Sequence, residues 1–186
     1  GFGVVQIFAA DLDLQSTGTI DADLGQIQIE ATNSGNIALG TSTSSCGGVC
    51  EFVIDELELS RITALDNGPP SLILGDNSFT HASMFVGAIG AAQSNLIQND
   101  IIMQSGGSIT FEGVATFNSF AAFSDQGINV NFDLSTDAGS LALDGDNDGD
   151  FSHTIVVGDG RSVTASGTGS FINLVSATDI AAGTAG

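Results

Sequence analysis

One short phrase recurs along this chain: a glycine, any residue, a branched apolar residue, any residue and another apolar residue. Clear copies lie at residues 25–29, 35–39, 107–111 and 139–143, and a weaker copy lies at residues 18–22. Each copy predicts a turn followed by a β-strand whose side chains alternate between two faces. Repetition of one turn-plus-strand unit favours a solenoid, in which the chain stacks successive coils on itself.

The phrases predict a single all-β domain with three stretches. Repeat strands are expected in residues 1–40 and 101–186, and an irregular insertion that contains a cysteine loop is expected in residues 41–100. Within the insertion, residues 52–59 fit either a strand or one face of a helix. Residues 80–93 fit either a pair of strands or one short helix.

Phenylalanines in the C-terminal stretch are candidates for the core. Stacked coils place like residues above like at the strand spacing of about 4.8 Å. We therefore expect an interior aromatic stack built from Phe111, Phe117, Phe120, Phe123 and Phe132. The alternative fold is an antiparallel β-sandwich with the same side chains inside. The fixed place of the glycine in each phrase favours the solenoid.

The charge balance excludes several partners. The chain has 22 acidic residues against two basic ones, Arg61 and Arg161, and its net charge is −20. A nucleic-acid backbone and an anionic membrane surface would both be repelled. The longest apolar run, residues 84–92, is too short to insert across a bilayer. The acidic residues indicate a solvated surface, with divalent-cation binding or a high-salt habitat as alternatives.

The two cysteines, Cys46 and Cys50, are separated by a stretch that contains two glycines. As a metal site the pair is poor, because there is no third thiolate and both His81 and His153 lie far off in sequence. A small disulfide loop, and with it an oxidising compartment, is favoured. Two reduced thiols in a turn are the alternative.

Residues 137–146 and 155–165, together with the glycine phrases, resemble filamentous-haemagglutinin-like β-strand-repeat proteins, which are large secreted bacterial surface proteins. The resemblance covers residues 1–40 and 101–186 well and residues 41–100 poorly. It implies a right-handed parallel β-helix, export to the cell surface, and roles in adhesion, biofilm or filament formation. It carries no catalytic residues to this chain. The cysteine loop departs from the family pattern, and the short chain indicates a segment of a longer protein.

The sharpest local signal is an acidic turn at residues 144–150, with carboxylates at alternate positions. Asp144, Asp146, Asp148 and Asp150 match the first half of a calcium loop, with a glycine at the sixth position. Ile155 stands where an EF-hand needs a bidentate glutamate, so an EF-hand is rejected. A Ca²⁺ site in a surface turn remains a hypothesis beside a merely solvated turn.

The sequence does not predict an enzyme. It contains none of the nucleophile, zinc-protease or phosphate-binding motifs, and no tryptophan or tyrosine for a sugar cleft. We expect instead a structural, secreted module of a bacterial surface fibre or adhesin that self-assembles through β-strand contacts. Its expected partners are further copies of itself or a longer parent chain, and a host or matrix glycan or protein.

Two alternatives remain from the residues alone. Residues 4–14 are apolar and extended, so they fit a donor strand inserted into the next subunit of a pilus-like filament. A calcium-dependent carbohydrate-binding module built on residues 144–150 is the other alternative.

Overall fold

The computed structural model describes residues 3–32, 35–40, 50, 52–65, 71–75, 83–178 and 180–182. These residues are almost entirely β-structure; the two helices among them, α1 (Glu56–Leu59) and α2 (Ala91–Ser94), have four residues each. In the described part of the chain, neither helix has the length or apolar character needed to cross a membrane. The prediction of an all-β chain is confirmed.

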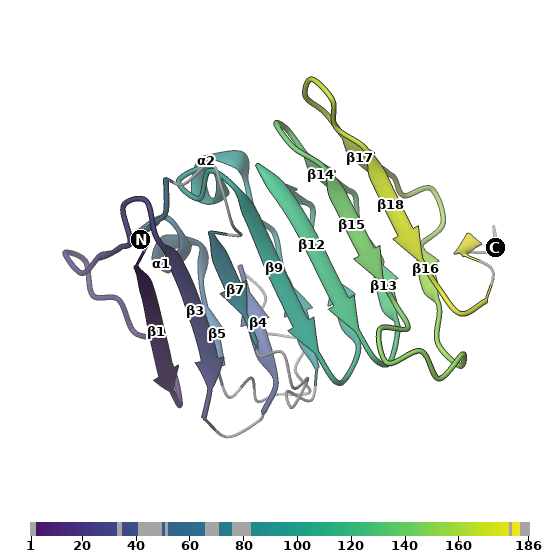
Figure 1. The fold of residues 1–186 in the computed structure, drawn as a ribbon, viewed down its shortest axis with the longest axis horizontal. Coiled ribbons are helices and arrows are strands. Elements are labelled where there is room, and N and C mark those ends of the chain that lie inside the picture. Colours follow the sequence, from purple (N-terminus) through teal and green to yellow (C-terminus); the bar gives the residue numbers. More distant parts are fainter. Residues whose placement is uncertain are drawn as a thin grey trace.

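Two long sheets extend along the molecule, the first in front of the second in Figure 1. The first sheet contains, in spatial order, β1 (Val4–Ala9), β3 (Gln26–Ala31), β7 (Leu72–Leu74), β9 (Asp100–Ser105), β12 (Ser119–Ser124), β15 (Leu141–Asp144) and β18 (Ile172–Val175). The second sheet contains β5 (Phe52–Ile54), β4 (Ile37–Leu39), β8 (Met84–Val86), β10 (Ile109–Phe111), β13 (Ile128–Val130), β16 (Ile155–Val157) and β19 (Ala181–Ala182).

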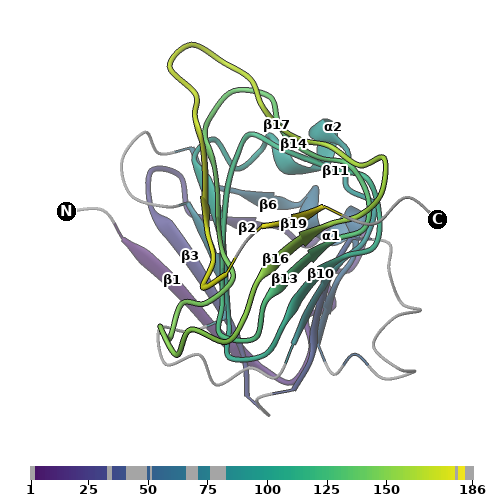
Figure 2. The same cartoon turned by 90° about the vertical axis from the view of Figure 1, so that its right-hand side faces the viewer.

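Shorter strands close the third side of the molecule. One small sheet contains β11 (Ala115–Phe117), β14 (Leu134–Thr136) and β17 (Val163–Ala165), and another contains β2 (Ile20–Asp21) and β6 (Ile62–Thr63). From β10 onward the chain visits the second, third and first sides in turn and then repeats the order. Figure 2 looks along this stack, and the successive passages lie around a common centre.

Every strand pair in the described residues is parallel. Parallel neighbours need a long connection between them, here a full passage through the other sides. The alternative of an antiparallel β-sandwich is therefore wrong. The long parallel sheets are consistent with the expected solenoid.

The glycine phrases fall where strands begin. β3, β4, β10 and β15 each start within two residues of the phrase glycine, as expected. At Gly25 the reason is steric, because a Cβ there would lie 2.4 Å from the carbonyl oxygen of Gly3. The turn glycine thus permits the close approach of neighbouring backbone segments.

Inward side chains form apolar ladders from one strand to the next. In the second sheet, Ile37, Met84, Ile109, Ile128 and Ile155 are paired in succession, and each is at most 1% exposed. Full burial of such a side chain stabilises a fold by about 1.5–3 kcal/mol. The core is therefore continuous along the stack.

The expected insertion at residues 41–100 is only partly irregular. β7 lies between β3 and β9, and β8 lies between β4 and β10, so both belong to the long sheets. β5 instead turns back and pairs on the N-terminal side of β4. Both ambiguous segments contain two elements: residues 52–59 contain a strand followed by α1, and residues 80–93 contain β8 and the start of α2.

The predicted aromatic stack is partly wrong. Phe111, Phe117 and Phe120 are buried at 0–1% exposure, but Phe123 and Phe132 are only half-buried. Phe123 points outward because its strand alternates, and the Phe132 ring lies 5.0 Å from the guanidinium carbon of Arg161. The three buried rings come from β10, β11 and β12, so they pack within one passage of the chain rather than between passages.

Candidate functional site

The acidic turn lies between β15 and β16, and its own side chains hold its backbone. An Asp144 carboxylate oxygen accepts a hydrogen bond from the Asp146 N–H at 3.1 Å, and Asp148 accepts from the Asp150 N–H at 3.2 Å. These short-range bonds are typical of aspartates in turns. Asp144 and Asp148 therefore stabilise the turn. Neither belongs to the cluster of possible metal ligands formed by Asp146, Asp150 and His153.

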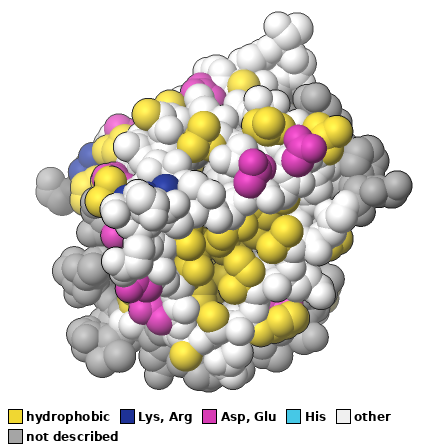
Figure 3. Space-filling model, turned by 90° about the vertical axis from the view of Figure 1, so that its left-hand side faces the viewer, with side chains coloured by type: hydrophobic (Ala, Val, Ile, Leu, Met, Phe, Trp, Pro, Cys, Tyr) yellow, Lys and Arg dark blue, Asp and Glu magenta, His cyan; other side chains and the backbone are white. Residues whose placement is uncertain are grey.

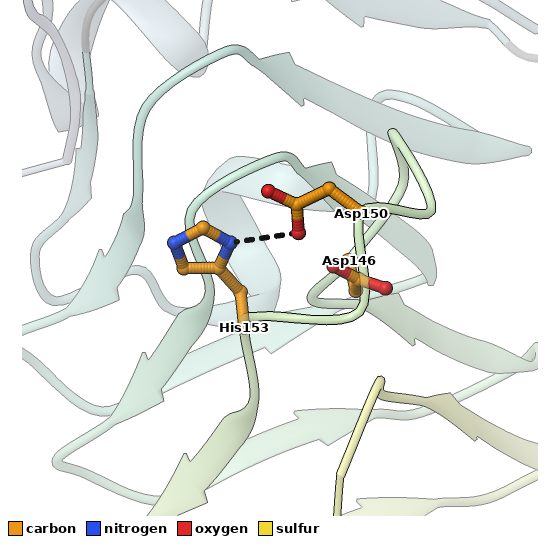
Figure 4. A group of neighbouring side chains, drawn as sticks. All are labelled: Asp146, Asp150 and His153. Carbon is orange, nitrogen blue, oxygen red and sulfur yellow. Dashed lines mark ion pairs between the residues drawn. The ribbon is translucent and has the colours of Figure 1, made fainter.

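Three side chains of this region converge. Possible ligand atoms of Asp146, Asp150 and His153 all lie within 4.8 Å of one another (Figure 4). His153 Nδ1 lies 3.6 Å from Asp150 Oδ1 and 2.8 Å from the hydroxyl of Ser152. The structure thus brings together two of the four predicted aspartates and adds a histidine that the sequence reasoning had set aside.

Asp146 is the buried member of this cluster. Its side chain is 8% exposed, and its Oδ2 accepts a hydrogen bond from the Phe151 N–H at 3.2 Å. Its Oδ1 is buried and has no hydrogen-bond partner within the described structure. Phe151 itself has φ +64°, an uncommon conformation for a bulky residue, and its ring is exposed. The chain is therefore held in a strained turn beside an unsatisfied carboxylate oxygen.

The pKa values of two carboxyl groups in this region, Asp150 and Asp125, are shifted in opposite directions. Hydrogen bonding by the Ser152 side chain lowers the pKa of Asp150. Burial opposes this shift, and the Ser152 backbone, the Asp146 side chain and His153 add smaller contributions that lower the pKa further. Burial, followed by repulsion from aspartates of the acidic turn, raises the pKa of Asp125. Asp150 therefore stays ionised to lower pH than an ordinary aspartate, while Asp125 lies in a crowded negative region.

A second feature is a groove of about 390 Å³ where strands of the first sheet begin. Its lining is mostly polar and consists of Gln98, Asn99, Asp100, Asn118, Ser119, Ala138, Gly139, Ser140 and Phe171. The Asn118 amide donates to the Gln98 carbonyl at 2.6 Å, and the Phe171 ring is 61% exposed. The groove and the acidic turn lie at opposite ends of β15.

The third feature is the pair of open ends of the molecule. Apolar residues that only partly pack against the core belong to the first and last passages: Ile7, Ala9, Leu12, Leu14, Ile20 and Ala22 at one end, and Val157, Val163, Ala165 and Leu174 at the other. Figure 3 views the N-terminal end and shows hydrophobic side chains gathered at its centre with acidic groups around them. Within the described residues, the edge of the core is therefore exposed at both ends.

The predicted disulfide involves a residue outside the described ranges. Cys46 and His81 are not described, whereas Cys50 is described and half-buried. The disulfide between Cys46 and Cys50 therefore stays a prediction.

Comparisons of this chain with protein-family models, with curated proteins and with solved structures find no match in any of the three. The resemblance to haemagglutinin-like repeat proteins is untested by them.

Proposed function

We propose that this chain is a structural, non-enzymatic module of a secreted bacterial surface fibre or adhesin. In this proposal its fold is a right-handed parallel β-helix, and its copies stack end to end through β-strand contacts. The observation that supports the proposal most directly is that β1 and β18 are the outer strands of the same parallel sheet. Each has one edge without a strand neighbour in the described structure.

The unpaired backbone groups of the two edges are complementary. On β1, the Gly3 and Ala9 carbonyls accept hydrogen bonds from β3 and its neighbouring residue, so the backbone of Gln6 faces the other way. On β18, the Phe171 and Val175 carbonyls accept from the β15 side. The groups of Ile172 and Leu174 therefore face outward, because successive residues of a parallel strand bond alternately to its two sides.

When β1 of a second copy is placed beside β18 of the first, one register continues the hydrogen bonding of the parallel sheet. Gln6 of one copy lies opposite Asn173 of the next, so the Gln6 N–H reaches the Ile172 carbonyl. The Gln6 carbonyl accepts from the Leu174 N–H. The same register places the inward side chains Val5 and Ile7 opposite Ile172 and Leu174, which continues the apolar ladder of the core.

Outward side chains also match in this register. Phe8 and Val175, 58% and 44% exposed, become neighbours, as do Val4 and Phe171. Apolar residues at solvent-facing positions of the two end strands are expected where a further strand covers them. Open strand edges promote pairing with another chain unless they are blocked.

The test is the size of the purified chain in solution, measured by light scattering with electron microscopy. We expect concentration-dependent linear particles for the unchanged chain. The double variant Ile172→Asp with Leu174→Asp places charge in the joint and should give single subunits. Val114→Asp is the matched control, because Val114 is 52% exposed but lies away from both end strands.

A monodisperse monomer at high concentration, or particles that persist in the double variant, would contradict end-to-end assembly. Secretion and surface location are tested separately by antibody labelling of intact cells that produce the protein. Labelling only after cell lysis would contradict this part of the proposal.

The donor-strand alternative is disfavoured, because β1 pairs along its full length with β3 of its own chain. A carbohydrate-binding role has a specific observation in its favour, the groove with side-chain amides and an exposed aromatic ring. Asn118→Ala should then abolish binding on a glycan array, while Asn129→Ala, on the second sheet, should not. Binding that is equal in both variants would remove the groove as a glycan site.

A further inference from the structure

We infer that Asp146, Asp150 and His153 form a binding site for a divalent transition-metal ion, with Zn²⁺ as the best match. This site differs from the calcium turn expected from the sequence in its ligands and in its metal. It is independent of the proposed end-to-end assembly, because the turn lies at the side of the stack, between β15 and β16.

The spacing of the three side chains suits one small ion. Bonds of about 2.0–2.2 Å to nitrogen and oxygen place two ligands of a tetrahedral Zn²⁺ about 3.4 Å apart. His153 Nδ1 and Asp150 Oδ1 are 3.6 Å apart, and the ligand atoms of all three residues lie within 4.8 Å. Small side-chain movements are enough to close the set around an ion.

The buried oxygen of Asp146 points independently to a missing partner. A carboxylate oxygen buried without a hydrogen bond is costly, and native structures normally satisfy such a group with a donor or a cation. Asp146 Oδ1 is buried and unpartnered, while Oδ2 is held by the Phe151 N–H. A bound cation would satisfy the first oxygen and leave the second bond unchanged.

The imidazole of His153 favours Zn²⁺ over Ca²⁺. Ca²⁺ takes six to eight oxygen ligands, whereas Zn²⁺ commonly combines histidine nitrogen with carboxylate oxygen. All four aspartates of the turn accept backbone N–H groups, but only Asp146 and Asp150 also lie beside the imidazole, and Asp144 and Asp148, which a calcium loop would use, lie outside this cluster. Two carboxylates and one imidazole leave a fourth position for water or an external ligand.

The remaining charges that face the cluster favour any cation. Asp125, Asp144 and Asp148 lie close enough to act electrostatically within this region. A dication would offset several negative charges at once. Long-range attraction is shared by Ca²⁺, Mg²⁺ and Zn²⁺, so selectivity for Zn²⁺ must come from His153.

The experiment is calorimetric titration of the metal-stripped chain with ZnCl₂, and separately with CaCl₂ and MgCl₂, together with melting temperatures. We expect one Zn²⁺ per chain and a rise in melting temperature at Zn²⁺ concentrations where Ca²⁺ and Mg²⁺ have no effect. His153→Gln should weaken Zn²⁺ binding by roughly 100-fold or more, since loss of even an outer-shell partner costs about 10–100-fold. Asp148→Asn is the control, because it removes a negative charge from the same turn without removing a proposed ligand, and it should bind nearly as the unchanged chain does.

His153 is partly exposed, so His153→Gln is expected to fold even if Asp146→Asn does not. Circular dichroism of each apo variant checks this. The inference is overturned if Zn²⁺ gives no saturable binding, if His153→Gln and Asp148→Asn bind it equally, or if Ca²⁺ binds more tightly and ignores the loss of the imidazole.

Discussion

Phe117 and Phe120 stack with ring centroids 4.3 Å apart and ring planes 16° apart, although they belong to strands of two different sheets. Both rings are at most 1% exposed, so they fill the corner where the chain turns from one side to the next. Phe117→Ala should lower the free energy of unfolding by about 3–5 kcal/mol. Phe123→Ala, on the outward face of β12, should cost about 1 kcal/mol. Urea unfolding of both variants measures this, and equal losses would contradict the assignment of the core.

Gly75 is expected to tolerate no side chain. Its φ is +89°, and a Cβ would lie 2.1 Å from the Gln104 carbonyl oxygen. Gly160 also has positive φ, +67°, but a Cβ there would meet open space. Gly160→Ala should lower the free energy of unfolding by about 1 kcal/mol, because of the backbone conformation alone. Gly75→Ala should lower it by about 1–3 kcal/mol more, because of the added clash. Thermal unfolding of the pair separates the two effects, and identical losses would exclude a steric role.

Glu58 connects the first passage of the chain to α1. One carboxylate oxygen accepts from the Leu14 N–H and the other from the Asp55 N–H, each at 2.9 Å. Glu58→Ala should lower the free energy of unfolding by about 1–3 kcal/mol, because two N–H groups lose their acceptor. Hydrogen exchange at the Leu14 amide should accelerate in this variant. Glu56→Ala removes the same charge from the same helix, and faster exchange at Leu14 there as well would contradict a specific role.

Asp125→Asn should raise the melting temperature at neutral pH. Burial, with repulsion from the acidic turn, raises the pKa of Asp125 above its unfolded value. The folded state therefore holds this proton more tightly, and stability falls as pH rises through the folded pKa. The gain should be present at about pH 7 and absent at about pH 2.5, where the carboxyl is protonated in both states. Asp159→Asn, on the exposed surface, is the control, and a gain that persists in acid would refute the electrostatic cause.

End-to-end assembly should strengthen with salt. Each copy has a net charge of −20, so copies repel one another as they approach. The Debye length falls from about 10 Å at 0.1 M salt to about 3 Å at 1 M, which screens this repulsion. Particle length by light scattering should therefore increase with NaCl. Shortening with NaCl would indicate that the joint depends on ion pairs instead of apolar contacts.

Much of the strand content could be predicted, because each glycine phrase combines a turn residue with two-residue alternation. β3, β10 and β15 follow the phrases directly. Alternation does not say which strand becomes the neighbour, so nothing local predicted that β5 would pair behind β4. Phe123 was placed inside for a related reason, since its outward position depends on where β12 begins.

The candidate site was half visible in the sequence. The alternating aspartates marked the turn, but their equal spacing does not show which of them lie near His153. His153 was considered as a partner of the distant cysteines and not of the acidic turn, although it stands three residues after Asp150. That short separation was the available signal. The unpaired oxygen of Asp146 depends on burial by distant residues, which no local pattern encodes.

The unbroken ladder from Ile37 to Ile155 has a consequence for how such a chain can change in evolution. Ile109 pairs with apolar residues on both sides, Met84 before it and Ile128 after it. A tandem duplication of residues 109–127 would therefore present each new strand with partners of the kind it already has. Such duplications can lengthen the stack by one complete passage at a time, while the end strands β1 and β18 keep their sequences.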